Sequence, residues 1–221
     1  MSVSPAPLKT ALITSAGREP ARSLVLALAG WGWRLALNDL VPLRLEETAE
    51  LARGLGAQVS THTGDSSKGL FARGLVEDTL DHWGQIDLLV NCPQAAPRLP
   101  LLDMDEWDFQ RTLEANVHGP FLLMQLVGNW MRNEQKPGML LNLITSPAAV
   151  PERAGSEAFY ASQMALRALT AAAAPGLGLY HISVYGICVS ENEGQRLVAR
   201  ARELLDPRQT VPAGSVFQDG W

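Results

Sequence analysis

Basic residues are few and scattered in this chain, which excludes one broad class of partner. Its 221 residues include 18 Lys and Arg against 23 Asp and Glu, and the formal net charge is −5. No cluster of Lys and Arg occurs along the chain, so no basic face is available for a phosphate backbone. We therefore expect no nucleic-acid partner.

Cysteine and histidine are also scarce. Cys92 and Cys188 lie far apart in the sequence without metal-ligand spacing, which indicates reduced thiols in the core and a cytoplasmic protein. No two histidines have the i, i+4 spacing of a metal site on a helix; they are His62, His82, His118 and His181. The sequence therefore predicts neither a disulfide nor a metal site.

Long apolar runs are missing as well. Residues 24–29 and 168–174 are apolar, but both stretches are far shorter than a membrane span. Near the N-terminus, Lys9 alone precedes one short apolar run, which does not match a secretory leader. We expect no signal peptide and no membrane anchor.

The chain does contain enough apolar material for one full core. Hydrophobic residues make up 47% of it, and its 14 prolines and 19 glycines are scattered rather than concentrated. No low-complexity linker and no repeat of fixed period occurs. Length and composition predict a single domain over residues 1–221, with residues 1–7 as a loose tail.

Strand and helix patterns alternate along this domain. Short apolar runs typical of strands occupy residues 11–14, 34–37, 58–61, 86–90, 139–144, 181–189 and 215–217. Apolar residues at helical spacing occupy residues 20–29, 43–55, 69–82, 105–131, 157–174 and 193–205. This alternation predicts an α/β fold, a Rossmann-like doubly wound parallel sheet in a single domain. A ligand of such a fold binds beyond the carboxyl ends of the strands, and a nucleotide pyrophosphate sits at the first strand-to-helix turn.

Motifs at the ends of the predicted strands carry a family resemblance. The first strand ends in Thr14, the second in Asn38-Asp39, and Gly64-Asp65 follows the third. Further along come 88–91 (Leu-Leu-Val-Asn), 116–119 (Asn-Val-His-Gly), Thr145-Ser146, 160–162 (Tyr-Ala-Ser) and the closing segment 211–220. In this order they resemble the short-chain dehydrogenase/reductase family from Lys9 to Trp221.

The resemblance implies roles for individual residues. Asp39 would bind the adenosine ribose hydroxyls and repel a 2′-phosphate, favouring NAD over NADP. Asp65 and Asn91 would contact the rest of the adenosine half, and Thr14, Ser15 and Gly17 would form the phosphate turn. By the same resemblance, the catalytic residues would be Asn116, Ser146 and Tyr160.

The phosphate turn departs from the family pattern Thr-Gly-x-x-x-Gly-x-Gly. Thr14 is followed by Ser15, Glu19 and Ala21 at the three glycine positions, where glycine permits a tight turn and close approach of the backbone to the pyrophosphate. Glu19 puts a carboxylate at the helix N-terminus. There it either favours the helix dipole, with Pro20 as a good first-turn residue, or excludes a phosphate. Both interpretations weaken dinucleotide binding.

The catalytic helix departs from the pattern too. Met164 stands four residues after Tyr160, where the family has Lys. That Lys lowers the pKa of the Tyr hydroxyl, so without it Tyr160 is a poor general acid or base near neutral pH. Replacement by Arg167, one helix turn further on, stays open.

The surroundings of the predicted site are altered at two further places. Residues 92–94 (Cys-Pro-Gln) replace the family's Asn-Ala-Gly, and Val189-Ser190 replace a Pro-Gly near the nicotinamide. From Ser190 the chain enters the helix at 193–205 almost at once, whereas the family inserts a substrate-covering loop and helices. Without that cover, water is not excluded from the site.

The helices at 105–131 and 157–174 are apolar over much of their circumference, so both need a second cover. In the family this pair packs against its copy, and we expect a dimer or tetramer, with itself or with a related active subunit.

Three functional hypotheses follow from the sequence. The first is a non-catalytic structural or regulatory subunit with no NAD(H) binding or weak binding. The second is an active NAD(H)-dependent oxidoreductase for a small alcohol or ketone, with non-standard cofactor binding. The third is a sensor of another nucleotide or small ligand in the crevice.

Overall fold

The computed structural model describes residues 8–145, 155–189, 193–206, 208, 212 and 215–217. Its elements alternate as the apolar pattern predicts. They are β1 (Thr10–Ile13), α1 (Ala21–Gly30), β2 (Arg34–Asp39), α2 (Pro42–Gly54), β3 (Val59–Thr63), α3 (Gly69–Trp83), β4 (Leu88–Asn91), α4 (Glu106–Leu113), the π-helix η1 (Glu114–His118), α5 (Gly119–Asn133), β5 (Gly138–Thr145), α6 (Glu157–Gly178), β6 (Ile182–Val189), α7 (Gly194–Leu205) and β7 (Val216–Phe217).

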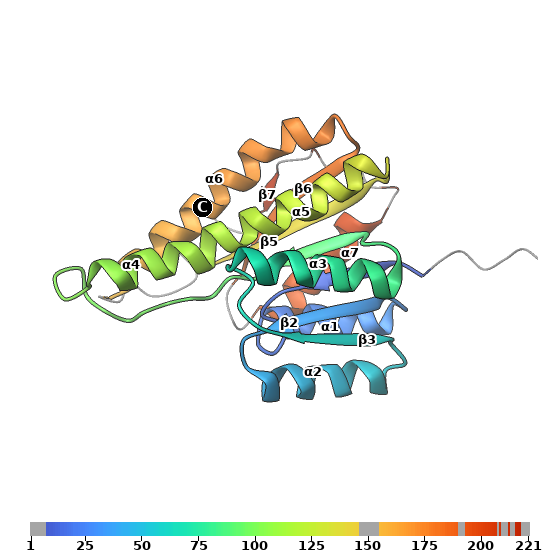
Figure 1. Cartoon of the computed structure of the whole chain (residues 1–221), viewed down its shortest axis with the longest axis horizontal. Coiled ribbons are helices and arrows are strands. Elements are labelled where there is room, and N and C mark those ends of the chain that lie inside the picture. Colours follow the sequence, from blue (N-terminus) through green and yellow to red (C-terminus); the bar gives the residue numbers. More distant parts are fainter. Residues whose placement is uncertain are drawn as a thin grey trace, which may run out of the picture.

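The strands form one parallel sheet of seven, in the order β3-β2-β1-β4-β5-β6-β7 (Figure 1). The order reverses between β1 and β4, so the carboxyl ends of these two strands border a crevice, the place where such folds bind ligands. The prediction of a Rossmann-like doubly wound sheet in a single domain is confirmed.

Side chains of the central strands alternate between two cores. Ala11 and Ile13 of β1 pack into the core beneath α1, α2 and α7, whereas Leu12 packs into the core beneath α3, α5 and α6. This alternation is the two-residue period of a strand. Because helices cover both faces, the strands β1, β2, β4 and β6 consist mainly of buried residues, whereas the edge strands β3 and β7 are only partly buried.

The long helix predicted over 105–131 is confirmed, since helical residues run without a break from Glu106 to Asn133. The pattern did not predict its middle, where the π-helical segment η1 joins α4 to α5. Asn116 lies in the π-helical segment, and its fully buried side chain bonds to Ala95 and Ser162. A local i→i+5 turn commonly occurs where a side chain must be redirected, and periodicity of apolar residues does not reveal it.

The helix predicted to end at residue 174 also runs further. α6 continues through Pro175 to Gly178, with the proline inside the helix. The N-terminal tail predicted at 1–7 and most of the closing segment lie outside the described residues. No helix in the described part of the chain is both long and apolar enough to cross a bilayer.

Candidate functional site

A cavity of about 230 Å³ lies at the carboxyl ends of β1, β2 and β4. Five of the six residues predicted to bind a cofactor line it: Thr14, Ser15, Asp39, Asp65 and Asn91. The sixth, Gly17, is adjacent, because its backbone N–H donates to Asp39 Oδ2 at 3.0 Å. The structure thus brings the whole predicted cofactor set together, but the cavity is smaller than the roughly 300–1,000 Å³ of typical ligand pockets.

The turn after β1 keeps a tight shape without its first glycine. Ser15 has a φ of 51°, in the left-handed region that glycine adopts most easily. Thr14 holds the turn to β4, since its Oγ1 accepts from Cys92 N at 3.1 Å. The backbone N–H of Ala16 donates to Asn38 O at 3.0 Å. These bonds fix the turn between β2 and β4.

Gly17 is required by packing rather than by its backbone angles. A Cβ at this position would lie 2.8 Å from Arg44 Cβ and 3.0 Å from Leu45 N. The second of these contacts is backbone of α2 and cannot rotate away.

We expect Gly17→Ala to lower the free energy of unfolding by about 1–2 kcal/mol, the usual cost of overpacking. Urea unfolding followed by circular dichroism measures it. Gly74→Ala in α3 is the matched control, because its Cβ would meet nothing within 4 Å and alanine favours the helix by about 0.5–1 kcal/mol. Equal stability of the two variants would contradict the prediction.

Glu19 occupies the N-terminus of α1 with its own carboxylate. Its Oε2 accepts from Ser23 Oγ at 2.6 Å and from Ser23 N at 3.3 Å. The carboxylate thus binds a hydroxyl and an amide of the first turn, which supports the helix-stabilising interpretation. The same position carries negative charge where an anion would otherwise bind.

Gln94 ties the two sides of the crevice together. Its Nε2 donates to Glu19 O at 2.8 Å and to Cys92 Sγ at 3.2 Å, while Arg18 Nη2 donates to Gln94 O at 3.3 Å. We call these bonds the Gln94 bridge. The sequence indicated added bulk at Gln94; it did not reveal that the side chain joins the turn after β1 to the loop after β4.

Both acidic residues predicted for the adenosine half are engaged by the protein itself. Asp39, 7% exposed, accepts from Gly17 N and from Val41 N, each at 3.0 Å. Asp65 pairs with Arg111 of α4, with Nη2 to Oδ2 at 2.7 Å, and accepts from Ser67. Burial opposes ionisation of Asp65, but the bonds from Ser67 and the charge of Arg111 outweigh it, so the pKa of this carboxyl lies below its usual value. Sequence reasoning missed Arg111, which no motif marks.

A chain of buried amides runs from the crevice into the core. Asn91 Nδ2 donates to Asn142 Oδ1 at 2.9 Å, and Asn142 Nδ2 donates to Thr170 Oγ1 at 2.9 Å. All three residues are fully buried. Within the part of the chain that the structure describes, Asn91 Oδ1 has no hydrogen-bond partner, and Asn91 lines the cavity. A buried acceptor of this kind is usually satisfied by a water or a ligand.

The predicted catalytic residues are only partly brought together. Asn116 donates to Ala95 O at 2.7 Å and to Ser162 Oγ at 2.9 Å, and accepts from Ala95 N at 2.9 Å. Its side chain therefore holds the loop after β4. Tyr160 is half-buried on α6, with its ring 5.8 Å from that of Phe159. Ser146 lies outside the described residues.

Met164 lies in a different environment from the crevice. It lines an open hollow of about 410 Å³ together with Arg167 and Val216. Burial raises the pKa of the Cys188 thiol and the charge of Arg167 lowers it, which places this guanidinium near β6. Between Tyr160 and Met164, Gln163 is fully buried and joins β5 to the loop after β4, accepting from Thr145 N at 2.8 Å and donating to Pro93 O at 3.3 Å.

The remaining candidate groups add no further chemistry. Cys92 and Cys188 are free thiols, and burial raises the pKa of Cys92 to about 11. Among the described residues, no group of three or more His, Cys, Asp or Glu could hold a metal ion. β6 ends at Val189 and α7 begins at Gly194, so only residues 190–193 separate them. The sequence predicted such a short connection at this place.

A parallel sheet whose crevice lies between β1 and β4, with an acidic side chain ending β2, defines the Rossmann-like class of nucleotide-binding folds. Within that class, the model of the short chain dehydrogenase family matches residues 9–200. The chain belongs to this family.

Individual relatives support the assignment. An uncharacterized oxidoreductase from Thermotoga maritima is 29% identical over 92% of this chain and 79% of its own length. A diacetyl reductase ((S)-acetoin forming) from Staphylococcus epidermidis is 26% identical over 95% of this chain and 81% of its own. The crystal structure of NAD⁺-bound xylitol dehydrogenase is similar with a TM-score of 0.76, at 26% identity, over 93% of this chain and 80% of that one. Most of the named relatives are dehydrogenases or reductases.

Proposed function

We propose that this protein is a non-catalytic member of the short-chain dehydrogenase family that serves as a structural or regulatory subunit of an oligomer in the cytoplasm. The observation that carries the proposal is the carboxylate of Glu19, bound to Ser23 N and Oγ in the first turn of α1. In Rossmann-like folds this turn attracts the pyrophosphate by its free N–H groups and its dipole. Here the carboxylate of Glu19 accepts from the N–H of Ser23, and its negative charge interacts with the helix dipole in place of a phosphate.

The crevice fits one half of NAD and not the other. Asp39, Asp65 and the unpaired Asn91 Oδ1 are polar groups suited to adenosine. The diphosphate would have to displace Glu19 and the Gln94 bridge, and a carboxylate repels it at short range. Because the pyrophosphate normally fixes the nicotinamide against the catalytic residues, weak or absent NAD(H) binding follows.

The residues at the predicted catalytic positions also support a non-catalytic protein. NAD supplies a hydride acceptor when it is bound; the protein must supply a proton-transferring hydroxyl and a closed site. Tyr160 has Met164 where a cation would lower its pKa, and only residues 190–193 stand where a cover would be. Whether Arg167 supplies the missing positive charge remains a prediction; Arg167 lines the same hollow as Met164.

An apolar groove between α5 and α6 supports the proposed oligomer. Phe121 and Tyr180 are 41% and 45% exposed at its edges. Leu169 and Leu177 of α6 line it, with a cavity of about 210 Å³. A groove of this kind on paired helices suits the same helices of a second copy or of a related active subunit.

Calorimetric titration tests the proposal. We expect no saturable heat with NADH or NADPH up to about 1 mM, the upper end of usual enzyme affinities. The NAD⁺-bound xylitol dehydrogenase is the positive control. Saturable binding of NADH would overturn the proposed absence or weakness of NAD(H) binding, and turnover in addition would overturn the non-catalytic assignment. Light scattering of the same sample should give a multiple of the 23.9 kDa chain mass. A monomeric mass would exclude the homo-oligomer, and the proposed subunit would then have to assemble with a different chain.

The unpaired Asn91 Oδ1 favours two alternatives in which the crevice is occupied. One is an active NAD(H)-dependent oxidoreductase for a small alcohol or ketone, in which Asp39 disfavours NADP. The other is a sensor of a different nucleotide or small ligand. Turnover of NADH with diacetyl or a similar small ketone would support the first, and saturable binding without turnover would support the second.

A further inference from the structure

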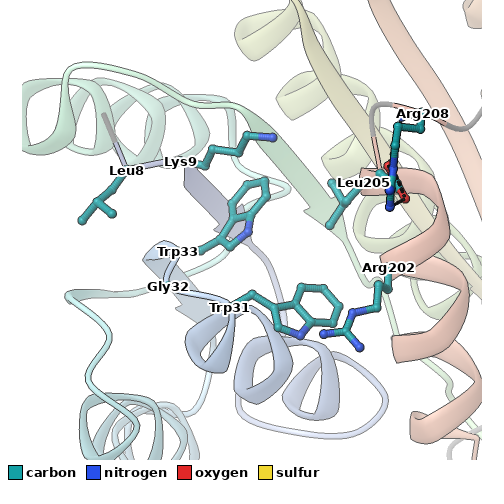
Figure 2. A pocket seen from close by; sticks show the side chains of 9 residues that line it. Leu8, Lys9, Trp31, Gly32, Trp33, Arg202, Leu205 and Arg208 are labelled. Carbon is teal, nitrogen blue, oxygen red and sulfur yellow. Dashed lines mark hydrogen bonds and ion pairs between the residues drawn. The ribbon is translucent and has the colours of Figure 1, made fainter. Parts of the chain in front are cut away.

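A second hollow lies at the end of the sheet opposite the crevice. It has a volume of about 550 Å³ and is built from the segment before β1, the loop between α1 and β2, and the end of α7 (Figure 2). These segments meet at the amino ends of the strands, whereas Asp39 and Asn91 lie at the carboxyl ends. Its volume is within the roughly 300–1,000 Å³ of pockets that bind small molecules.

Two indole rings form one side of this hollow. Trp31 and Trp33 flank Gly32, whose φ of 80° requires glycine. The turn is tied down, because Trp31 N donates to Ala27 O at 3.0 Å and Trp33 N to Leu28 O at 3.1 Å. Figure 2 shows both rings at the hollow, with Leu205 of α7 across from Trp33. Trp33 is only 8% exposed and Trp31 is half-buried, so Trp31 offers the larger aromatic surface, and both rings can contact the edge or face of a ligand ring.

Three cations surround these rings. Lys9 Nζ lies 5.4 Å from the ring centre of Trp33, and Arg202 Cζ lies 5.0 Å from that of Trp31. Neither cation is in an ion pair within the part of the chain that the structure describes. The third, Arg208, pairs with Asp206 at 2.7 Å. One carboxylate against three cations leaves the hollow positive, in a chain whose net charge is −5.

The charge and the shape together specify a ligand. A guanidinium binds a carboxylate through two parallel hydrogen bonds, and an ammonium adds a point charge. The indole rings and Leu205 are apolar, so they do not stabilise a second charged group of the ligand, but they can pack against an aromatic ring. We propose that this hollow binds a small planar aromatic carboxylate, with its ring beside Trp33 and Leu205 and its carboxylate on Arg202, while Lys9, which lies on the other side of Trp33 in Figure 2, adds positive charge at longer range.

NMR of the indole N–H groups tests the proposal with 1-naphthoate as the probe. The chain has six tryptophans, and the variants Trp31→Phe and Trp33→Phe assign the two signals of interest. We expect these two signals to shift saturably while the other four stay in place. The neutral 1-naphthamide and the non-aromatic cyclohexanecarboxylate should each bind at least about fivefold more weakly, because each lacks one of the two recognised features.

Charge variants make the test specific. Arg202→Gln and Lys9→Gln should each weaken naphthoate binding by about fivefold, and both residues are exposed, so the fold is retained. Lys136→Gln is the matched control, because Lys136 lies 5.3 Å from the ring of Trp130 outside the hollow; it should change nothing.

Several outcomes would overturn the proposal. They are equal shifts of all six signals, equal binding of the amide, equal loss in Lys136→Gln, or no shift of the Trp31 and Trp33 signals at millimolar naphthoate. A glutamate-rich peptide that shifts those two signals when naphthoate does not would assign the surface to a protein partner instead. None of these outcomes depends on whether NADH binds in the crevice.

Discussion

The double variant Glu19→Gly with Met164→Lys is expected to bind NADH about a hundredfold more tightly than the natural chain. Removing the carboxylate from the first turn of α1 frees Ser23 N and the helix dipole for a phosphate, an effect of up to about 2 kcal/mol. Met164 borders the hollow beside Arg167 and not the cavity, so a lysine there adds a charged hydrogen-bond donor, worth about 1.5–3 kcal/mol, only where its longer side chain reaches the bound cofactor. About 1.4 kcal/mol changes affinity tenfold, and calorimetry measures it.

Single variants separate the two contributions. Glu19→Gln keeps an oxygen that can accept from Ser23 and removes only the charge. If Glu19→Gly binds NADH more tightly and Glu19→Gln does not, the effect comes from the volume of the side chain and not from its charge. No gain in the double variant would mean that the obstacle is the bulk at Pro93 and Val189, the Gln94 bridge or the short connection 190–193. The bridge survives both changes, because Gln94 donates to the backbone oxygen of residue 19.

Asn142→Ala is expected to lower the free energy of unfolding by about 3 kcal/mol. Asn142 is fully buried and accepts from Asn91 Nδ2, whose own Oδ1 already has no partner. The substitution would leave the whole Asn91 amide without a protein partner and open a cavity beside Thr170. A buried unsatisfied group costs about 1–3 kcal/mol, and the cavity adds to it. Urea unfolding measures the change.

Asn133→Ala is the control for that variant. Asn133 is exposed at the end of α5 and outside the groove, and alanine there should change stability by no more than about 0.5 kcal/mol. Similar stabilities of the two variants would contradict the prediction.

The fold was predictable because apolar periodicity determines it. Ala11, Leu12 and Ile13 are all apolar and followed by a helix pattern, which in a parallel sheet means burial on both faces. What the pattern could not show is the π-helical segment around Asn116. Its cause is a set of hydrogen bonds to Ala95 and Ser162, residues distant in sequence, and no local propensity encodes them.

The part of the candidate site that was predictable consists of the motif residues at the ends of the strands. Thr14, Asp39 and Asn91 meet at one edge because parallel strands end together. The Gln94 bridge and the Asp65–Arg111 pair were not predictable, because each joins residues from different loops through side-chain conformations that depend on the folded backbone. The sequence indicated an obstructed crevice without revealing the bonds that obstruct it.

The Gln94 bridge has a consequence for how long the protein survives in the cell. A fold whose strand ends are joined by a bound cofactor gains stability with the logarithm of that cofactor's concentration, so its turnover follows metabolic supply. Here Gln94 and Arg18 make the corresponding link from within the chain. If the crevice stays empty, as we propose, the stability of this protein does not change with nucleotide concentration.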